Sequence, residues 1–259
     1  MGFEEEAEYL DAALGAMVEV AVRAGRHLNV RPHGKGTNSV GALVVHCCAV
    51  CELWLGHVAL GRADRRDRDA EFAARTQLVH LEAAVERTRH RSRDDLAALA
   101  REPGRASELR AHLPAGGTDR ALVLHVLREL HQHLGHMELA IDALRDQGRL
   151  DEPLFHVALA ADWAAATGSP ERRYEVSTIG RTLDEVGFVH CSFADQVAAT
   201  AERFYRDRDD VLLLRIDPTR LDAVVRVENL EGGEEQFPHL YGPLPVDAVT
   251  AAEPLHPDG

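Results

Sequence analysis

The amino-acid sequence predicts two domains, an up-down four-helix bundle followed by a small mixed α+β domain. At 259 residues the chain is long enough for two domains of ordinary size. Apolar residues recur at helical spacing as far as Leu144, whereas short strand-like segments begin at Leu154. Residues 146–153, DQGRLDEP, lie between these patterns and combine charged side chains with Gly and Pro. We therefore predict a helical domain over 1–148 and an α+β domain over 152–259.

Composition narrows the partners and the compartment that we expect. The formal net charge is −14, which makes nucleic acid and anionic membrane surfaces poor partners. The N-terminus is acidic, unlike a signal sequence, and no run approaches the ~20 apolar residues of a membrane span. The four cysteines do not have the pattern of a secreted disulfide framework. We expect a cytoplasmic protein, and the sequence leaves its oligomeric state open, a homodimer included.

The longest predicted helix covers residues 121–144, ALVLHVLRELHQHLGHMELAIDAL. Its apolar residues follow steps of three and four, at Val123, Leu127, Leu130, Leu134, Met137, Ile141 and Leu144. Glu129 and His133 lie on the flank of this stripe, one turn apart, with Cβ atoms ~5–6 Å from each other. Two ligands one turn apart can bind one metal ion. A hydrogen-bonded Glu–His pair at a helix seam explains the same spacing equally well.

Two helices are predicted in the N-terminal part of the chain. Residues 3–28 have apolar side chains at helical spacing, and a loop with Gly and Pro follows them. A second helix covers about 40–60, with Asn38 or Ser39 as its cap. The core face of this second helix includes His46, which we therefore expect to point inward.

A third helix is predicted from about Ala70. Ser92 and Asp95 have the spacing of a capping box, which indicates a break near Arg91. The preceding segment, 61–69, is rich in Arg and Asp, and we expect it to be a solvated loop. Four helices in sequence favour an up-down bundle, and metal sites in such bundles take their ligands from facing helices.

Two motifs give this bundle a specific resemblance. The segments NSVGALVVHCCAVCELWLGHVALGR and, about eighty residues later, HVLRELHQHLGH resemble the DinB superfamily of helical metalloproteins. The closest branch includes the mycothiol-dependent maleylpyruvate isomerases, and the resemblance covers about residues 1–150. It implies a divalent, zinc-like ion bound by His46, Glu129 and His133. His136 occupies the Gly-His position of the family and is expected beside the metal ligands or facing substrate, as the catalytic residue.

The implied chemistry follows from the number of ligands. A tetrahedral ion with three protein ligands keeps one position open, which is typical of catalytic sites. The resemblance implies that a low-molecular-weight thiol such as mycothiol binds there. Its thiolate would attack an electrophilic substrate, in S-transfer or in thiol-assisted isomerisation.

The cluster of Cys47, Cys48 and Cys51 contains a C-x-x-C motif. The motif lies in the middle of a predicted helix, whereas redox motifs of this kind begin a helix that follows a strand. Buried cysteines often pack as small apolar residues. We assign all three to packing.

After residue 153 the pattern changes to short strands. We predict strands at 154–159, 174–177, 188–191, 211–216, 224–228 and 246–251, and helices at 161–166 and 194–205. The spacing favours an α+β domain with mostly antiparallel strands. No Gly-rich phosphate loop is present in this part of the sequence.

The motifs FHVALAADW, GFVHCSFADQV and FPHLYGPLPVDAV resemble a small bacterial family known as a domain of unknown function, whose fold is similar to ADP-ribosyltransferases. The resemblance covers about 154–255. It implies that His156, on the first strand, contacts a nicotinamide dinucleotide (NAD). The other residues implied in the same cleft are Tyr174, Ser177, His190, Ser192, Gln196, Phe237, His239 and Tyr241. Glu228 is the candidate for a catalytic glutamate. In the alternative interpretation these polar aromatic residues hold loops in a binding or structural module.

Three classes of function therefore stay open. The first is a metal-dependent thiol transferase or isomerase, which acts on a small thiol and an electrophile. The second is an NAD-consuming, ADP-ribosyltransferase-like activity of the C-terminal domain. The third is a metal-binding protein without catalytic turnover.

Overall fold

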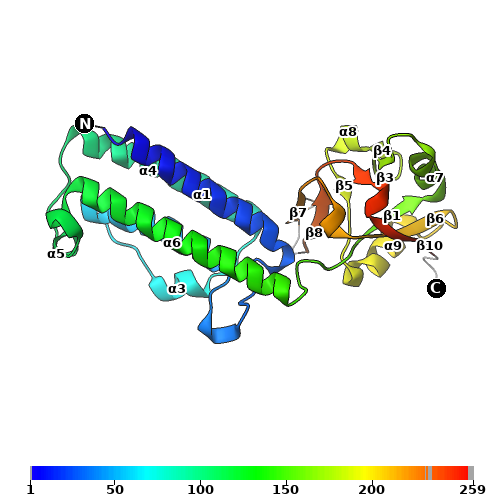
Figure 1. Ribbon diagram of the computed structural model, residues 1–259, viewed down its shortest axis with the longest axis horizontal. Coiled ribbons are helices and arrows are strands. Elements are labelled where there is room, and N and C mark those ends of the chain that lie inside the picture. Colours follow the sequence, from blue (N-terminus) through cyan, green and yellow to red (C-terminus); the bar gives the residue numbers. More distant parts are fainter. Residues whose placement is uncertain (1, 231, 233–234, 256–259) are drawn as a thin grey trace. The chain divides into compact units, whose positions relative to one another are not determined.

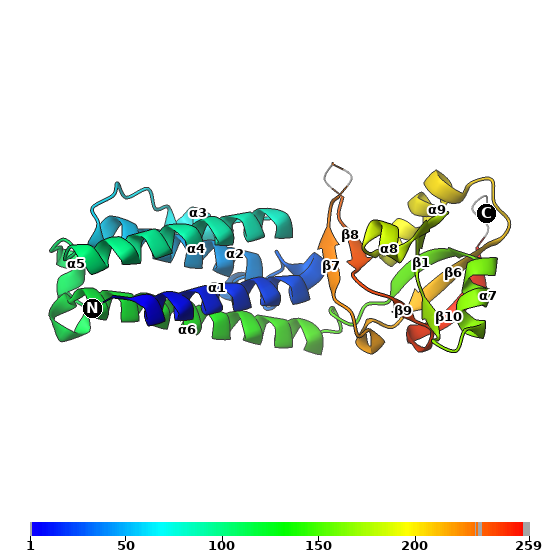
Figure 2. The ribbon, with the colours of Figure 1, turned by 90° about the horizontal axis from the view of Figure 1, so that it is seen from above.

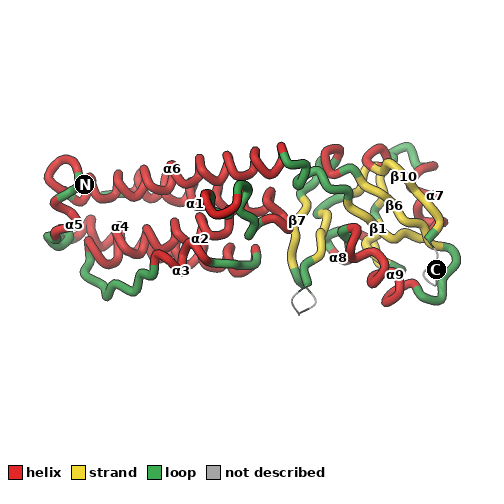
Figure 3. The backbone as a smooth tube through the Cα atoms, turned by 90° about the horizontal axis from the view of Figure 1, so that it is seen from below, coloured by secondary structure: helices red, strands yellow, loops and turns green. Residues whose placement is uncertain are grey.

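The structure is a computed structural model that describes residues 2–230, 232 and 235–255. The chain divides into two compact units, Met1–Asp146 and Gln147–Gly259. In the described residues, the first unit contains only helices and the second contains all the strands (Figures 1 and 3). The predicted class, a helical unit followed by an α+β unit, is confirmed.

Long helices build the N-terminal unit: α1 (Glu4–Ala24), α2 (Val40–Cys51), α4 (Leu78–Arg101) and α6 (Asp119–Asp146). A π-helix, Glu52–Ala59, continues α2, and the short helices α3 (Arg68–Ala73) and α5 (Glu108–Ala111) lie in the connections. Helix α1 packs against α4 and α6, and α2 packs against α3, α4 and α6 (Figures 1 and 2). Each long helix therefore presents one face to a shared core.

Apolar burial holds this bundle together. Leu14, Met17, Leu130, Met137 and Ile141 are completely buried between α1 and α6 or their neighbours. Full burial of one such side chain contributes ~1.5–3 kcal/mol. The core face predicted for residues 121–144 is therefore the face that packs.

The start of α2 is fixed by a side-chain cap. Of the two predicted caps, Ser39 does this, because its Oγ accepts a hydrogen bond from the backbone N–H of Ala42 (3.3 Å). Contrary to the expectation that no run approaches a membrane span, the helical stretch Gly34–Ala59 is long and apolar enough, by length and composition alone, to cross one, and 67% of its window is buried in the structure. Its place among the other helices accounts for that apolar composition.

The predicted break near Arg91 is wrong. The interruption lies earlier, after α3, and α4 runs without a break through Ser92 and Asp95, which are both buried. Two hydrogen bonds between Asn29 and Thr76 hold the interrupted segment: Asn29 Nδ2 donates to the Thr76 carbonyl (2.8 Å), and the Thr76 N–H donates to Asn29 Oδ1 (2.9 Å). Partners 47 residues apart set this break, so local sequence signals do not reveal it.

The segment 61–69, expected to be solvated, instead carries an ion-pair clamp. Arg62 donates to both carboxylate oxygens of Asp95 on α4 (2.5 and 2.7 Å) and to both oxygens of Glu52 (3.0 and 3.1 Å). Asp95 is 5% exposed, so it needs such a partner. The clamp ties this connection and the π-helix to α4.

The C-terminal unit is built of short antiparallel strands. One sheet has the order β1 (Leu154–Leu159), β6 (Val211–Ile216) and β10 (Val249–Pro254), and another has β5 (Val189–His190), β8 (Phe237–Leu240) and β7 (Val225–Glu228). Two further pairs are β2 (Arg173–Tyr174) with β9 (Leu244–Pro245), and β3 (Val176–Thr178) with β4 (Arg181–Thr182). The helices are α7 (Ala160–Gly168), α8 (Leu183–Val186) and α9 (Val197–Tyr205). All the pairs in the described residues are antiparallel, as expected.

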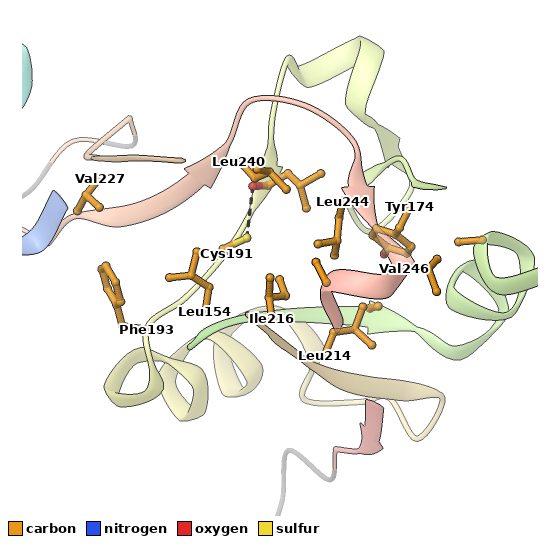
Figure 4. Packing of buried hydrophobic residues seen from close by; sticks show 14 residues of the cluster. Leu154, Tyr174, Cys191, Phe193, Leu214, Ile216, Val227, Leu240, Leu244 and Val246 are labelled. Carbon is orange, nitrogen blue, oxygen red and sulfur yellow. Dashed lines mark hydrogen bonds between the residues drawn. The ribbon is translucent and has the colours of Figure 1, made fainter. Parts of the chain in front are cut away.

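The core of this unit lies between the strands (Figure 4). Leu214, Ile216, Leu240 and Leu244 are completely buried, and Tyr174 is 1% exposed. The predicted strand 174–177 is divided in two, because Tyr174 pairs with Leu244 whereas β3 pairs with β4. The strands β4, β8 and β9 were not predicted.

Replacing Arg62 with Ala should lower the free energy of unfolding of the N-terminal unit by about 2 kcal/mol. Breaking a fully buried pair costs ~3–5 kcal/mol, and the side chain of Arg62 is 34% exposed. Arg91 donates to Glu52 Oε2 (3.3 Å), and its side chain is 62% exposed. It provides the control, because Arg91→Ala should cost less than ~1 kcal/mol. Urea titration of both variants measures the difference, and equal losses would contradict the clamp.

Cutting the chain near Gly148 should yield two folded pieces, 1–148 and 152–259, because the connecting segment is polar and each unit has its own buried core. Circular dichroism and amide-proton dispersion of the separate pieces measure this. An unfolded, insoluble 152–259 piece would show that the predicted boundary is wrong.

Candidate functional site

Three predicted ligands line one cavity in the N-terminal unit. The cavity has a volume of about 360 Å³, and α2 contributes His46 while α6 contributes Glu129 and His133. The other residues that line it are Val50, Leu53, Trp54, Arg66, Arg68, His125 and Gln132. Facing helices therefore bring the three side chains to one cavity.

The side chains are close to one another. The rings of His46 and His133 meet edge to face with centroids 4.7 Å apart, and His133 Nε2 lies 4.0 Å from Glu129 Oε2. His46 is 3% exposed, and the side chain of His133 is also mostly buried. The cluster is therefore shielded from bulk solvent on the α2 side.

Burial controls the charge of the two imidazoles. Desolvation lowers the pKa of His133 to about 4, with His46 and His136 adding to the effect. Desolvation also lowers the pKa of His46, against the opposing influence of Glu71. Both rings are neutral at pH 7, which is the form that binds metal ions.

The donor set fits a divalent ion in its chemistry. Across the described residues, no group of three or more His, Cys, Asp or Glu side chains lies in an arrangement that could hold a metal ion. His133 Nδ1 is nevertheless buried and has no hydrogen-bond partner, which is costly for a polar atom. Two neutral imidazoles and a carboxylate around one cavity are the ligand types that zinc prefers.

Glu71, on α3, is a site residue that the sequence did not reveal. Its Oε2 lies 2.7 Å from His46 Nδ1, and its Oε1 accepts from Arg66 Nε (2.9 Å). Glu71 is 5% exposed, and Phe72 next to it stacks on His46 with ring centroids 4.5 Å apart. The sequence placed Glu71 at the start of a long helix from about Ala70, whereas α3 is a short helix, Arg68–Ala73.

Two other histidines lie near the cavity. His125 is part of the wall and contacts Trp54 with ring centroids 4.3 Å apart. It is one turn before Glu129, so the spacing that singled out His133 also applies to it, although no role was predicted for it. His136 is exposed, and its ring lies 5.5 Å from that of His133, beside the cavity rather than in its wall.

The cysteine cluster lies inside the bundle. Cys47 and Cys51 are buried and free of disulfides, and burial raises the pKa of both thiols well above the ordinary value. Both are therefore protonated at neutral pH and pack as apolar side chains.

In the C-terminal unit, His156 is buried with both ring nitrogens occupied. Its Nδ1 donates to the carbonyl of His190 (2.6 Å), and its Nε2 accepts from the hydroxyl of Tyr174 (3.1 Å). Desolvation lowers the pKa of His156 to about 4. A ligand at His156 would have to displace one of these two partners.

A second group surrounds His239 on β8. His190 on β5 is its direct partner across the sheet, with ring centroids 5.5 Å apart, and Ser177 Oγ lies 3.1 Å from His190 Nδ1. The hydroxyl of Tyr241 donates to Glu228 Oε1 (2.6 Å), which lies 3.8 Å from His239 Nδ1. Six of the predicted residues are therefore brought into two adjoining groups: His156, Tyr174, Ser177, His190, His239 and Tyr241.

Ser192 and Gln196 have other partners. Ser192 Oγ lies 3.3 Å from Thr200 Oγ1, and Gln196 Nε2 donates to the carbonyl of Gln236 (2.9 Å). Gln196 Oε1 also accepts from the N–H of Phe193 (3.0 Å). These contacts hold in place the segment before α9 and the loop before β8. They agree with the alternative interpretation, in which these residues have a structural role.

The fold and the site define a two-unit protein, in which a DinB-like helical bundle with a His/Glu cavity precedes a small α+β domain. Residues 23–148 match the family model described as mycothiol-S-transferase, and residues 157–252 match the model described as protein of unknown function (DUF952). The chain thus joins a mycothiol-S-transferase-like bundle to a DUF952-like domain. The predicted resemblances to a DinB-type bundle and to a family of unknown function are confirmed, whereas the isomerase branch and the ADP-ribosyltransferase-like fold stay predictions.

Solved structures of protein CC0527 from Caulobacter crescentus are similar to part of the chain. The crystal structure is 31% identical, with 40% of this chain and 85% of that chain covered and a TM-score of 0.35. The crystal structure of a double mutant of the same protein is 30% identical, with the same coverage and TM-score. The solution structure is 31% identical over the same shares, also with a TM-score of 0.35. A search of curated proteins returned no match.

The buried state of His156 predicts a pH dependence of stability. Its pKa is about 4 in the folded protein and ~6.5 when unfolded, so the unfolded chain binds more protons between these values. Its stabilising contribution is complete above pH ~6.5 and is lost as the pH falls toward 4, by about 3 kcal/mol in total.

Urea unfolding at pH 7 and 4.5, followed by Trp163 fluorescence in a Trp54→Phe background, measures this loss for the C-terminal unit. His156→Gln should reduce the dependence and leave the part due to His239, whose pKa burial also lowers to about 4, whereas Tyr174→Phe keeps the imidazole and should retain the full dependence. An equal dependence in the His156→Gln variant would contradict the assignment.

Proposed function

We propose that the N-terminal unit is a divalent-metal-dependent enzyme, with zinc as the expected metal, that uses a low-molecular-weight thiol of the mycothiol type. The reaction is transfer of the thiol to an electrophilic carbon or a thiol-assisted isomerisation. The observation that carries the proposal is the cavity lined together by His46, Glu129 and His133. The match to the mycothiol-S-transferase model over this unit supports the same class of chemistry.

His46, Glu129 and His133 would hold the ion. When bound, the ion would lower the pKa of a thiol that coordinates it, so that the thiolate would be available near neutral pH. Burial keeps both imidazoles neutral and ready to act as ligands. Trp54 and Leu53 give the cavity an apolar wall, which limits access of water to the sulfur.

The proposed bond changes are those of nucleophilic substitution in S-transfer, in which the bond from carbon to the leaving group breaks, and of reversible nucleophilic addition in isomerisation. The thiol sulfur supplies the electron pair of a new C–S bond, and the displaced pair leaves with the leaving group in S-transfer. In isomerisation the pair moves into the substrate's unsaturated system, and returns when the thiol is expelled after rotation. We assign transfer of the thiol proton toward solvent to His136, which is exposed and adjacent to His133.

A second cavity provides room for the electrophile. It has a volume of about 510 Å³ and shares Leu53 and Arg66 with the first cavity. The two cavities therefore adjoin at these side chains. A substrate in the larger one would approach the thiol from the side of the segment that follows the π-helix.

We assign no activity to the C-terminal unit. Both ring nitrogens of His156 are engaged by protein groups, and the nucleotide interpretation depends on that residue. The contacts of Ser192 and Gln196 are those of a structural role.

Cobalt substitution provides the test. Adding mycothiol or a simpler thiol to the cobalt-loaded protein should produce the near-ultraviolet charge-transfer band of sulfur ligation. His46→Ala should abolish the band, and His133→Ala should lose the metal while remaining helical. Glu129→Gln should bind the metal more weakly, because a neutral amide is a poor ligand for a divalent ion. Full metal occupancy in His133→Ala would overturn the ligand assignment.

The cysteines provide the control. Replacing Cys47, Cys48 and Cys51 with Ala should leave the band intact, because we assign these thiols to packing. A band that is present without added thiol and disappears with these cysteines would mean that the protein supplies its own sulfur. A metal-loaded protein with no band on adding thiol would favour a non-catalytic metal-binding protein.

A further inference from the structure

The environment of His46 is more highly organised than that of the other two proposed ligands. One face of its ring stacks on Phe72, and its Nδ1 lies 2.7 Å from Glu71 Oε2. Arg66 reaches the same carboxylate with two nitrogens, Nε to Oε1 (2.9 Å) and Nη2 to Oε2 (3.2 Å). All these partners come from the α2–α3 connection and α3, so a single short segment determines how the ring is held.

The distances decide which ring nitrogen carries the proton. A carboxylate only accepts hydrogen bonds, so at 2.7 Å from Glu71 Oε2 the Nδ1 atom of His46 must be the donor. Arg66 Nη2 lies 3.3 Å from the same Nδ1, but an arginine can only donate, and it has Glu71 as its acceptor. If Nδ1 carried a lone pair, that lone pair would face a carboxylate oxygen at 2.7 Å, which is repulsive.

We propose that Glu71 is a positioning residue, which keeps the proton of His46 on Nδ1 and leaves the Nε2 lone pair free for a ligand in the cavity. The inference rests on the proposed function in that the ligand is the divalent ion. Arg66 holds Glu71 in turn, through two hydrogen bonds to its two oxygens. Carboxylates that accept from metal-binding histidines fix the tautomer and the ring orientation in this way.

The charge balance of the network supports this role. Glu71 is 5% exposed, and a buried carboxylate needs a compensating partner. Arg66 supplies the positive charge from a partly buried position, with 20% of its side chain exposed. The start of α3 is fixed by Asp67, whose side chain accepts from the N–H of Ala70 (2.9 Å), so the position of Glu71 on the first turn is defined.

The first experiment needs no metal. Long-range proton–nitrogen NMR of the metal-free protein at neutral pH reports the tautomer of each histidine, and the His46 signals are assigned by their loss in His46→Gln. We expect the proton on Nδ1 in the unaltered protein and a mixture of tautomers in Glu71→Gln, because the amide can either accept or donate. A His46 proton on Nε2 in the unaltered protein would overturn the inference.

The second experiment measures metal affinity by competition with a chelator. Glu71→Gln should weaken cobalt or zinc binding ~10–100-fold, the range found for such partners of ligating histidines. Glu52→Gln is the matched control, because Glu52 is also paired with an arginine but has Arg62 and Arg91 as partners, and its affinity should be unchanged. Unchanged affinity in Glu71→Gln, with the metal bound by the unaltered protein, would overturn the inference.

The two readouts separate the proposals. If the unaltered protein binds no divalent ion, the proposed function fails. The part of the inference that names the divalent ion as the ligand then fails too. The tautomer measurement would still decide the assignment of the proton to Nδ1, since it is made without metal. Circular dichroism of Glu71→Gln confirms that the helices are retained.

Discussion

The N-terminal unit depends on two arginines in the connection between α2 and α3. Arg62 pairs with the buried Asp95 on α4, and Arg66 pairs with the buried Glu71 on α3. A carboxylate that is removed from water needs a positively charged partner. The burial of the two acids therefore depends on the fold of this connection, which places the two arginines beside them. One of the two pairs stabilises the bundle, and the other orients a proposed metal ligand.

Helical periodicity predicted the direction of side chains on long elements, and the family resemblance selected the proposed ligands among them. His46, Glu129 and His133 lie on α2 and α6, where the apolar stripe determines which direction each side chain faces. Glu71 could not be found in the same way, because its helix is short and ends where Asn29 and Thr76 bind each other across the sequence. Side chains on short elements take their direction from such distant contacts.

The strands of the C-terminal unit show the same limit. Strand β1 was predicted at its observed bounds, since its six residues are apolar apart from His156. Strand β8 was not predicted, because Pro238 cannot donate to a neighbouring strand and normally argues against a central position. The carbonyl of Pro238 accepts a hydrogen bond from the N–H of Cys191 (2.9 Å), so β8 is still bonded to the segment that follows β5. The interpretation of His156 as a nucleotide contact came from the resemblance alone. It could not include the hydrogen-bond partners of His156, which lie on two other strands.

The side chains that form the wall of the proposed active site depend on the number of residues in the π-helix Glu52–Ala59. A π-helix closes its hydrogen bonds over five residues instead of four, so each turn contains more residues than an α-helical turn. Trp54 and Leu53, which face the cavity, lie inside this stretch. Removing one residue there would restore α-helical winding and bring a different side chain to the cavity while the ligands on α6 stayed in place. A change of one residue in the length of this stretch would therefore alter the wall of the cavity and leave the proposed ligands unchanged.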